Sequence, residues 1–240
     1  VGAVRALGLM VLGARAPAGA GTETPYPGIW RRWSASGLAT LMILSGALLN
    51  ERLDVIMVGI FAGAEETAIY GVAARIAQVG ALVLAGLMAQ FAPRVSAAMA
   101  REGWAEAGRL AVQTARMASA VLGILLVGAV LVGEPVLSIF GAEYRAGHTT
   151  LILLVLAQCA AAIFGLSGGA LVIAGAERAA LAGAALGLTL NIVLNLILTP
   201  QYGSIGAAIG TLCALGASNA FFGFWAMRRL PFPTTLFGRA

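Results

Sequence analysis

The sequence predicts an all-α, polytopic membrane protein with six transmembrane helices. Two observations carry this prediction: 60% of the 240 residues are hydrophobic, and only 10% carry a charge. A soluble domain has about 25% charged residues. The apolar residues also gather in long runs, and a helix needs roughly 20 of them in succession to cross a bilayer. The mean hydropathy of +0.93 agrees with a chain that lies largely within a membrane.

The first residues are expected to precede the membrane domain. Residues 1–15 hold a short apolar piece typical of the last turns of a preceding membrane helix, and residues 16–28 have the Pro- and Gly-rich composition of a linker. Trp30 and Trp33 flank two arginines, a pattern typical of the membrane interface. The chain is therefore divided into three predicted parts: 1–34 as helix tail and linker, 35–230 as the membrane domain, and 231–240 as a cytoplasmic tail.

Six apolar runs follow the interface, and each is long enough to cross the hydrocarbon core. Residues 175–178 and 200–203 separate the last three runs and contain helix-breaking Gly or Pro. Residues 134–147 predict a short helix on the outer surface, with Tyr144 as an interfacial anchor. The predicted spans are 35–61, 67–92, 107–132, 149–174, 179–199 and 204–227.

The distribution of arginine predicts the orientation. All fifteen basic residues are Arg. Nine of them fall in the tails and loops on one side of the predicted spans, whereas only Arg145 falls on the other side. Because cytoplasmic loops of membrane proteins carry the excess of basic residues, both ends of the chain are predicted to be cytoplasmic.

The composition excludes several classes of site. Without Lys the chain has neither a Walker A phosphate loop nor a Schiff-base lysine. A single histidine, His148, excludes the two-histidine zinc helix. Cys159 and Cys213 are isolated in apolar runs and are interpreted as small core residues, not as metal ligands or a disulfide. We therefore expect no cofactor, no metal and no nucleic-acid partner.

The stretch around Asp54, the only Asp in the chain, predicts a site within the membrane. Ionisable residues inside apolar spans are functional candidates by default. If spans 35–61 and 67–92 form an antiparallel hairpin centred near residues 64 and 65, Asp54 and Arg75 lie at the same depth, roughly 15 Å from its outer end. Two readings remain open: an ion pair that locks two helices together, or a charged wall of a water-filled cavity.

Further polar residues accompany this pair. Asn50, Glu51 and Asp54 fall within about 100° of one another on a helix, while Arg52 points nearly opposite to Asp54. Asn191 and Asn195 share one face of the fifth span, either as interhelical glue or as part of a site.

The third span has its own polar face near its cytoplasmic end. Arg109, Gln113 and Arg116 lie on this face. Arg109 is expected to extend to the membrane surface. Arg116 lies deeper and is placed to line a vestibule.

Four motifs, in order along the chain, resemble those of a known protein family. The first consists of residues 54–59 (DVIMVG) with residues 68–76 (AIYGVAARI). Residues 92–96 (APRVS) and 139–144 (IFGAEY) resemble two further motifs, and residues 191–208 (NIVLNLILTPQYGSIGAA) resemble the most specific one. The resemblance covers about residues 30–230 and is to the lipopolysaccharide and O-antigen flippase branch of the MOP/MATE-like exporter superfamily.

This resemblance implies a fold and a function. Members have two six-helix lobes that face each other across a central cavity, and this chain matches the second lobe. The other lobe is then expected from an N-terminal half that is missing here or from a second copy of a half-size chain. The implied activity is movement of a polyprenyl-diphosphate-linked oligosaccharide across the bacterial inner membrane by alternating access, for polysaccharide biosynthesis.

Candidate roles follow for the polar residues. Guanidinium groups bind phosphate bidentately and stay charged, whereas a carboxylate in a poorly hydrated cavity can bind a proton or a cation. The residues expected to contact the anionic headgroup are Arg75, Arg52, Arg116, Gln78, Asn191 and Asn195, and those expected to couple an ion gradient are Asp54 and Glu51.

Three other functions are alternatives to the flippase. The first is a related drug or metabolite antiporter, whose cavity should present acids without nearby Arg. The second is a non-transporting partner in a polysaccharide synthesis complex. The third is an enzyme acting on lipid-linked sugars, which needs clustered Asp or a His at the membrane surface. One deep Asp54 and a single His148 near the outer surface argue against an enzyme.

Overall fold

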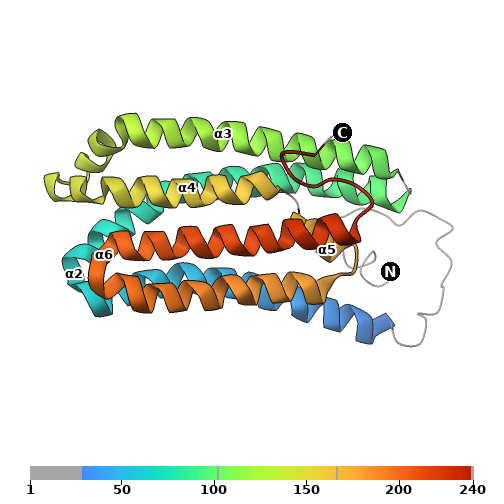
Figure 1. Ribbon diagram of the computed structural model, residues 1–240, viewed down its shortest axis with the longest axis horizontal. Helices are drawn as coiled ribbons and strands as arrows, with labels where there is room; N and C mark the ends of the chain where they lie inside the picture. Colours follow the sequence, from blue (N-terminus) through green and yellow to red (C-terminus); the bar gives the residue numbers. More distant parts are fainter. Residues whose placement is uncertain (1–28, 102, 166, 239–240) are drawn as a thin grey trace, which may run out of the picture. The chain divides into compact units, whose positions relative to one another are not determined.

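The computed structural model describes residues 29–101, 103–165 and 167–238. These residues form helices and no strands, so the prediction of an all-α fold is confirmed. The predicted helix tail and linker at residues 1–28 lie outside the described part of the chain. The elements are α2 (Ile29–Ala100), α3 (Trp104–Ser138), the 3-10 helix η1 (Ala142–Gly147), α4 (His148–Phe164), α5 (Ser167–Ile173) and α6 (Glu177–Arg229) (Figure 1).

The chain divides into two compact units, Val1–Leu41 and Met42–Ala240. The described part of the first unit is the beginning of α2, from Ile29 to Leu41. All further description concerns the second unit.

Helix α2 reverses direction at Gly63, where φ is +87°. Glycine suits this position because it adopts positive φ without the steric cost that a Cβ atom brings. The Thr67 hydroxyl donates a 2.7 Å hydrogen bond to the Gly63 carbonyl and satisfies it beside the reversal. The result is a first arm (42–62) and an antiparallel second arm (64–100). The hairpin expected to be centred near residues 64 and 65 therefore turns at Gly63, and residues 64 and 65 already belong to the second arm.

Helix α6 reverses in the same way at Gly203, where φ is +56°. Its first arm (177–202) and second arm (204–229) correspond to the predicted fifth and sixth spans. A Cβ atom at Gly203 would lie 3.0 Å from the Glu66 Oε2 atom, so the reversals of α2 and α6 are close neighbours.

The predicted fourth span is interrupted. Helix α4 ends at Phe164, and α5 begins at Ser167 after Gly165, where φ is +53°. A Cβ atom at Gly165 would lie 2.8 Å from the Ala115 Cβ atom, so α3 packs closely against the break. The prediction of one continuous helix over 149–174 was wrong because this packing is a tertiary contact that hydropathy does not report.

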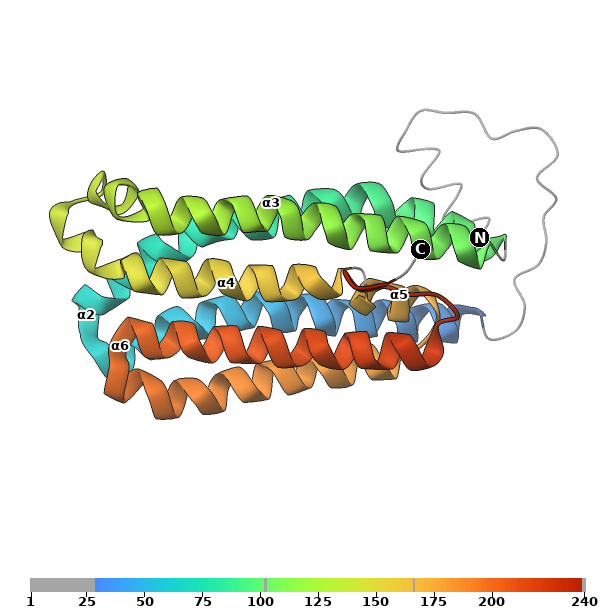
Figure 2. The same ribbon diagram turned by 45° about the horizontal axis from the view of Figure 1, so that its top comes forward.

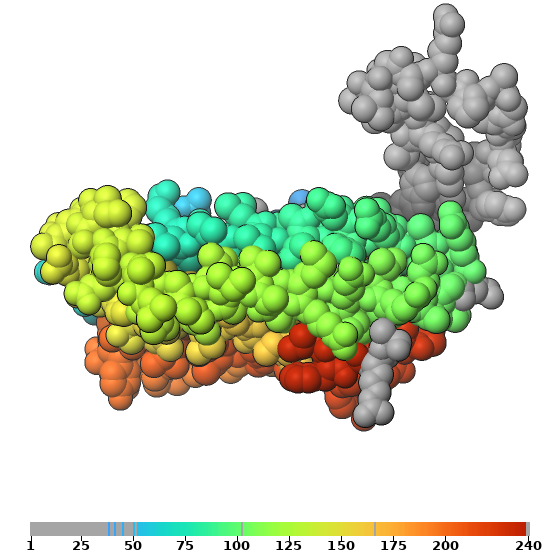
Figure 3. Space-filling view, turned by 90° about the horizontal axis from the view of Figure 1, so that it is seen from above, coloured from blue at the N-terminus to red at the C-terminus, as the bar shows by residue number. Residues whose placement is uncertain are grey.

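Residues 230–238, here named the C-terminal strap, pack over this break. The Leu236 N–H donates a 2.8 Å hydrogen bond to the Ile163 carbonyl, and the hydroxyls of Ser167 and Thr234 lie 2.7 Å apart. The Phe232 ring stacks on Trp104 of α3 with centroids 6.2 Å apart. This part of the predicted tail is therefore folded against α3 and the α4–α5 break. Figure 3 shows the strap, in red, beside α3.

The predicted surface helix at 134–147 was only partly right. Residues up to Ser138 continue α3, and the separate element is the 3-10 helix η1. Tyr144 is half-buried and packs against a core cluster that includes Val58, Tyr70 and Leu151. Its predicted role as an interfacial anchor is not tested by this packing.

The helices present apolar surfaces to their surroundings. Ile124 and Leu131 of α3 are each 72% exposed, which suits a helix that faces lipid. Helix α4 packs against both α3 and α6 (Figure 2). Because α2 and α6 each fold back, the long helices α2, α3, α4 and α6 make up six helical segments in the described part of the chain. Four described helices are long and apolar enough to span a membrane: Arg52–Ala100, Trp104–Ser138, Ala142–Phe164 and Glu177–Arg229.

Candidate functional site

Asp54, on the first arm of α2, is buried among neutral hydrogen-bond donors. Its side chain is 3% exposed. Oδ2 accepts hydrogen bonds from the Thr211 hydroxyl (2.8 Å) and the Tyr70 hydroxyl (3.2 Å), and Oδ1 accepts one from the Asn195 amide (3.1 Å). These donors come from the second arm of α2 and from both arms of α6. The hydrogen bonds offset the desolvation of a buried carboxylate and join four helical arms at one residue.

A second layer of polar groups supports these donors. The Asn195 Nδ2 atom also lies 3.2 Å from the Asn191 Oδ1 atom, and Thr199 donates a 3.0 Å hydrogen bond to the Asn195 Oδ1 atom. The Asn191 Nδ2 atom lies 3.4 Å from the Thr211 hydroxyl. Asn191 and Asn195 are both fully buried, as residues on one face of a packed helix must be. The six residues Asp54, Tyr70, Asn191, Asn195, Thr199 and Thr211 are named the Asp54 network below.

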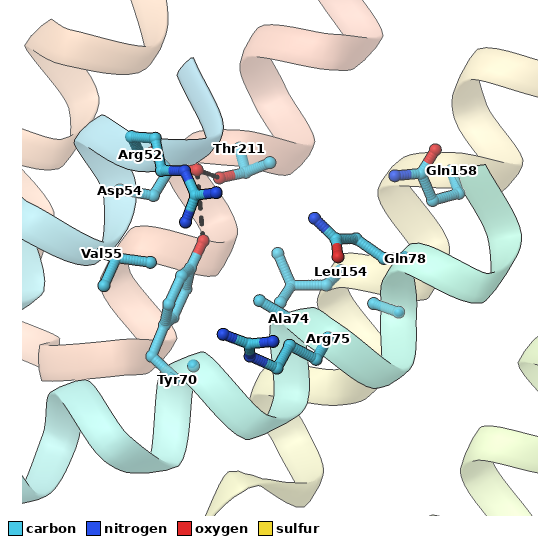
Figure 4. Close-up of a pocket in the computed structure, with 12 residues that line it drawn as sticks. Arg52, Asp54, Val55, Tyr70, Ala74, Arg75, Gln78, Leu154, Gln158 and Thr211 are labelled. Carbon is cyan, nitrogen blue, oxygen red and sulfur yellow. Dashed lines mark hydrogen bonds between the residues drawn. The ribbon is translucent and has the colours of Figure 1, made fainter. Parts of the chain in front are cut away.

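A cavity of about 230 Å³ opens beside the Asp54 network. Arg52 and Arg75 line it and are both exposed. Figure 4 shows the two guanidinium groups and Gln78 reaching into the space next to Tyr70. The lining residues come from α2, α4 and α6: Arg52, Asp54, Val55, Tyr70, Gly71, Ala74, Arg75, Ala77, Gln78, Leu154, Gln158 and Thr211.

Asp54 and Arg75 line this one cavity without forming a direct ion pair. The hydrogen-bond partners of Asp54 in the described part of the chain are hydroxyl and amide groups. Arg75, by contrast, is exposed at the cavity. The described residues therefore contain a charged cavity at this pair and no Asp54–Arg75 ion pair that would lock the two arms together.

Arg52 lines the cavity together with Asp54, although residues two apart in a helix project to nearly opposite sides. The long arginine side chain accounts for the difference, because its charged end can lie far from the direction of its Cβ atom. Figure 4 shows the Arg52 guanidinium beside the hydroxyl end of the Tyr70 side chain.

The other predicted residues fall in different places. Gln78 lines the cavity, whereas Asn191 and Asn195 are buried within the Asp54 network. Arg116 is exposed on α3, is absent from the cavity lining, and donates a 3.4 Å hydrogen bond to the Gly238 carbonyl in the strap. The side chain of Glu51 lies outside the described part of the chain.

Sequence reasoning missed Tyr70 and Thr211, the two hydroxyl donors to Asp54. Tyr70 lies seven residues after Gly63 and Asp54 lies nine residues before it, so counting outward from Gly63 would have placed them at similar depth. Thr211 carried no such signal, because its register against α2 depends on how α6 folds back at Gly203.

The arrangement allows two kinds of recognition side by side. A buried carboxylate surrounded by hydroxyl and amide oxygens offers hard oxygen ligands to a small cation, or a place for a proton. Exposed guanidiniums offer paired N–H donors to a phosphate or carboxylate. No group of three or more His, Cys, Asp or Glu suited to a metal occurs in residues 29–238 as far as they are described.

Comparison with known proteins adds one match. No curated protein and no solved structure matches the chain significantly. A protein-family model described as MatE matches residues 42–197, which is more than half of the chain. The matched stretch contains both arms of α2 in the second unit and most of the Asp54 network, including Asn191 and Asn195.

Proposed function

The chain belongs to the MatE family of polytopic membrane transporters, whose members are not enzymes, and on this premise we propose that it moves a lipid-linked oligosaccharide across a bacterial inner membrane. The cargo is an oligosaccharide on a polyprenyl diphosphate, used for polysaccharide synthesis such as that of lipopolysaccharide O-antigen. Transport proceeds by alternating access, with both ends of the chain in the cytoplasm.

The observation that carries this proposal is the pair of exposed guanidiniums at one cavity. Arg52 and Arg75 line a cavity within a largely apolar helical unit. A diphosphate cannot enter hydrocarbon unaided, and two guanidiniums supply the charge and the paired donors that phosphate oxygens accept. Gln78 and Gln158, which also line the cavity, add neutral amide groups suited to sugar hydroxyls.

The Asp54 network serves as the coupling site in this proposal. Its carboxylate joins both arms of α2 to both arms of α6 through Tyr70, Asn195 and Thr211. A proton or a sodium ion that binds at Asp54 competes for the same oxygens and so alters the contacts between these arms. Glu51 remains the second candidate for this role.

The cavity operates with a facing lobe in this proposal. The partner lobe comes either from an N-terminal half of the same protein or from a second copy of this chain. Rocking of the two lobes about the level of Asp54 and Arg75 would then expose the cavity to each side of the membrane in turn.

The direct test replaces Arg75 in the protein as it occurs in the cell and measures movement of a fluorescent polyprenyl-diphosphate oligosaccharide in vesicles. Arg75→Ala should reduce the rate at least tenfold, the loss of about one charge-assisted hydrogen bond, and Arg75→Lys should restore part of it. Arg94→Ala is the matched control, because Arg94 is exposed on the same helix but outside the cavity lining. An unchanged rate in Arg75→Ala rejects the headgroup role.

One observation favours a second candidate, an antiporter of cationic drugs or metabolites. Asp54 accepts its hydrogen bonds from neutral groups and forms no ion pair with a guanidinium among the described residues, although Arg52 and Arg75, which favour the flippase, line the same cavity. The two functions separate in one comparison. An antiporter should lose activity in Asp54→Asn and gain or keep affinity for cations in Arg75→Ala, whereas a flippase should lose transport in both variants.

A further inference from the structure

A second charged cavity lies where α6 begins and ends. Because α6 folds back at Gly203, its first and last turns lie at the same end of the unit (Figure 1). The space between them measures about 430 Å³ and shares no lining residue with the Asp54 cavity. Its lining residues are Gly175, Ala176, Glu177, Arg178, Ala179, Ala182, Phe221, Trp225 and Arg229.

The lining of this cavity carries a positive excess. It contains two arginines, Arg178 and Arg229, and one carboxylate, Glu177. Both arginines are exposed at the cavity, and no hydrogen bond or ion pair joins either guanidinium to another of the described residues.

Aromatic rings form one wall of the cavity and orient one of these cations. The Arg229 guanidinium lies 5.4 Å from the Trp225 ring centroid, within the range of a cation–π contact. Trp225 in turn packs at 6.2 Å against the ring of Phe221. Half-buried Trp beside Arg at the end of an apolar helix is typical of the headgroup level of a membrane.

An apolar track leads away from the cavity along the first arm of α6. Ala182 lines the cavity, and Leu186 and Val193 follow on the same helical face at i+4 and i+11. Leu186 is 41% exposed and Val193 is 44% exposed. A ligand with an anionic head and a hydrocarbon chain would match both the cavity and this track.

We propose that this cavity binds the phosphate headgroup of an acidic phospholipid from the surrounding membrane, held by Arg178 and Arg229, with an acyl chain along Leu186 and Val193. Basic pockets between membrane helices are suited to such headgroups because guanidinium pairs with phosphate where water is scarce. This site is separate from the transport cavity and does not depend on the proposed cargo.

The test measures lipids retained by the purified full chain in native mass spectrometry. Phosphatidylglycerol should bind about tenfold more tightly than phosphatidylcholine with the same acyl chains, because the choline cation offsets the phosphate charge. The double variant Arg178→Gln with Arg229→Gln should lose this preference, and the matching double Lys variant should keep most of it. Arg94→Gln is the matched control, because Arg94 is also exposed and lies over a ring, that of Phe91, at 5.7 Å.

Three results would overturn the proposal. The first is equal binding of the two lipids by the unaltered chain, which needs no variant to fold. The second is an equal loss in Arg94→Gln, which would reflect overall charge and not this cavity. The third is displacement of phosphatidylglycerol by millimolar inorganic phosphate, which would show that the cavity takes a free anion and that the acyl chain contributes nothing.

Discussion

The backbone N–H of Ser204 donates a 3.0 Å hydrogen bond to the Glu66 Oε2 atom. Ser204 is the first residue after the reversal of α6 at Gly203, and Glu66 lies three residues after the reversal of α2 at Gly63. The first N–H groups of a helical arm have no partner within the arm. A carboxylate placed there satisfies one of them and interacts favourably with the helix dipole, so this contact joins the two reversals.

Removal of this carboxylate should destabilise the protein. Glu66→Ala leaves the Ser204 N–H without its acceptor, and we expect a loss of about 1 kcal/mol, since Glu66 is only half-buried. Glu66→Gln keeps an acceptor oxygen and should lose less. The measurement is the free energy of unfolding in mixed micelles. Glu65→Ala is the control, because Glu65 is exposed beside it; an equal effect at both positions would contradict the contact.

The two glycine reversals should differ in their tolerance of alanine. Gly63→Ala places a Cβ atom in open space at φ +87° and ψ −179°, a backbone region that essentially only glycine adopts, so its cost of about 1–3 kcal/mol is backbone strain alone. Gly203→Ala at φ +56° adds an approach of 3.0 Å to Glu66 Oε2 and should cost more. Gly216→Ala, in a helical position with nothing within 4 Å, should be neutral or slightly stabilising.

Thermal unfolding of these three variants, in the same detergent, checks the order of their effects. Equal melting temperatures for Gly203→Ala and Gly216→Ala would show that the reversal of α6 does not require glycine.

Asp54→Asn should uncouple transport from ion gradients. The amide keeps the size of the side chain and one acceptor oxygen for Tyr70 or Thr211, but it removes the charge that binds a proton or a cation. We expect at least a tenfold loss of gradient-driven transport. Proton and sodium gradients are collapsed separately to identify the ion. Glu65→Gln is the control for charge at an exposed position, and full gradient dependence in Asp54→Asn would exclude Asp54 from coupling.

The strap should contribute to stability through the Ser167–Thr234 hydroxyl pair, whose oxygens lie 2.7 Å apart. Ser167 and Thr234 are each 1% exposed, so Ser167→Ala alone or Thr234→Val alone leaves a buried hydroxyl with fewer partners. Each change should cost about 1–2 kcal/mol, and the double variant should cost less than the sum. A double-mutant cycle on unfolding free energies measures this coupling. Strict additivity would mean that the two hydroxyls do not interact.

Hydropathy predicted the membrane fold because the thickness of a bilayer sets the length of the apolar run that each spanning helix needs. The sequence placed the two reversals near residues 64 and 65 and at residues 200–203, but it did not identify the single glycine at which each occurs, since the chain has 32 glycines. The break at Gly165 was missed for a related reason: its cause is contact with Ala115 and the strap, residues distant in sequence.

The part of the candidate site that lies on the α2 hairpin could be predicted from the sequence. Counting from the expected turn placed Asp54 and Arg75 at matching depth; they lie nine and twelve residues from the observed reversal at Gly63, and both line one cavity. Partners on α6 were harder to foresee, because the register of Thr211 against Asp54 depends on packing between hairpins. The depth of Arg116 in its predicted span suggested that it lines a vestibule. Its contact with Gly238 could not be predicted in this way, because that contact depends on where the strap folds.

The single-residue reversals have a mechanical consequence. A hairpin whose arms meet at one glycine has no spare chain, so neither arm of α2 or α6 can slide past its neighbour without distorting the junction. We therefore expect each hairpin to move as one stiff unit. The break between α4 and α5 at Gly165, over which the strap packs, is one place in the described chain where the helical unit can bend.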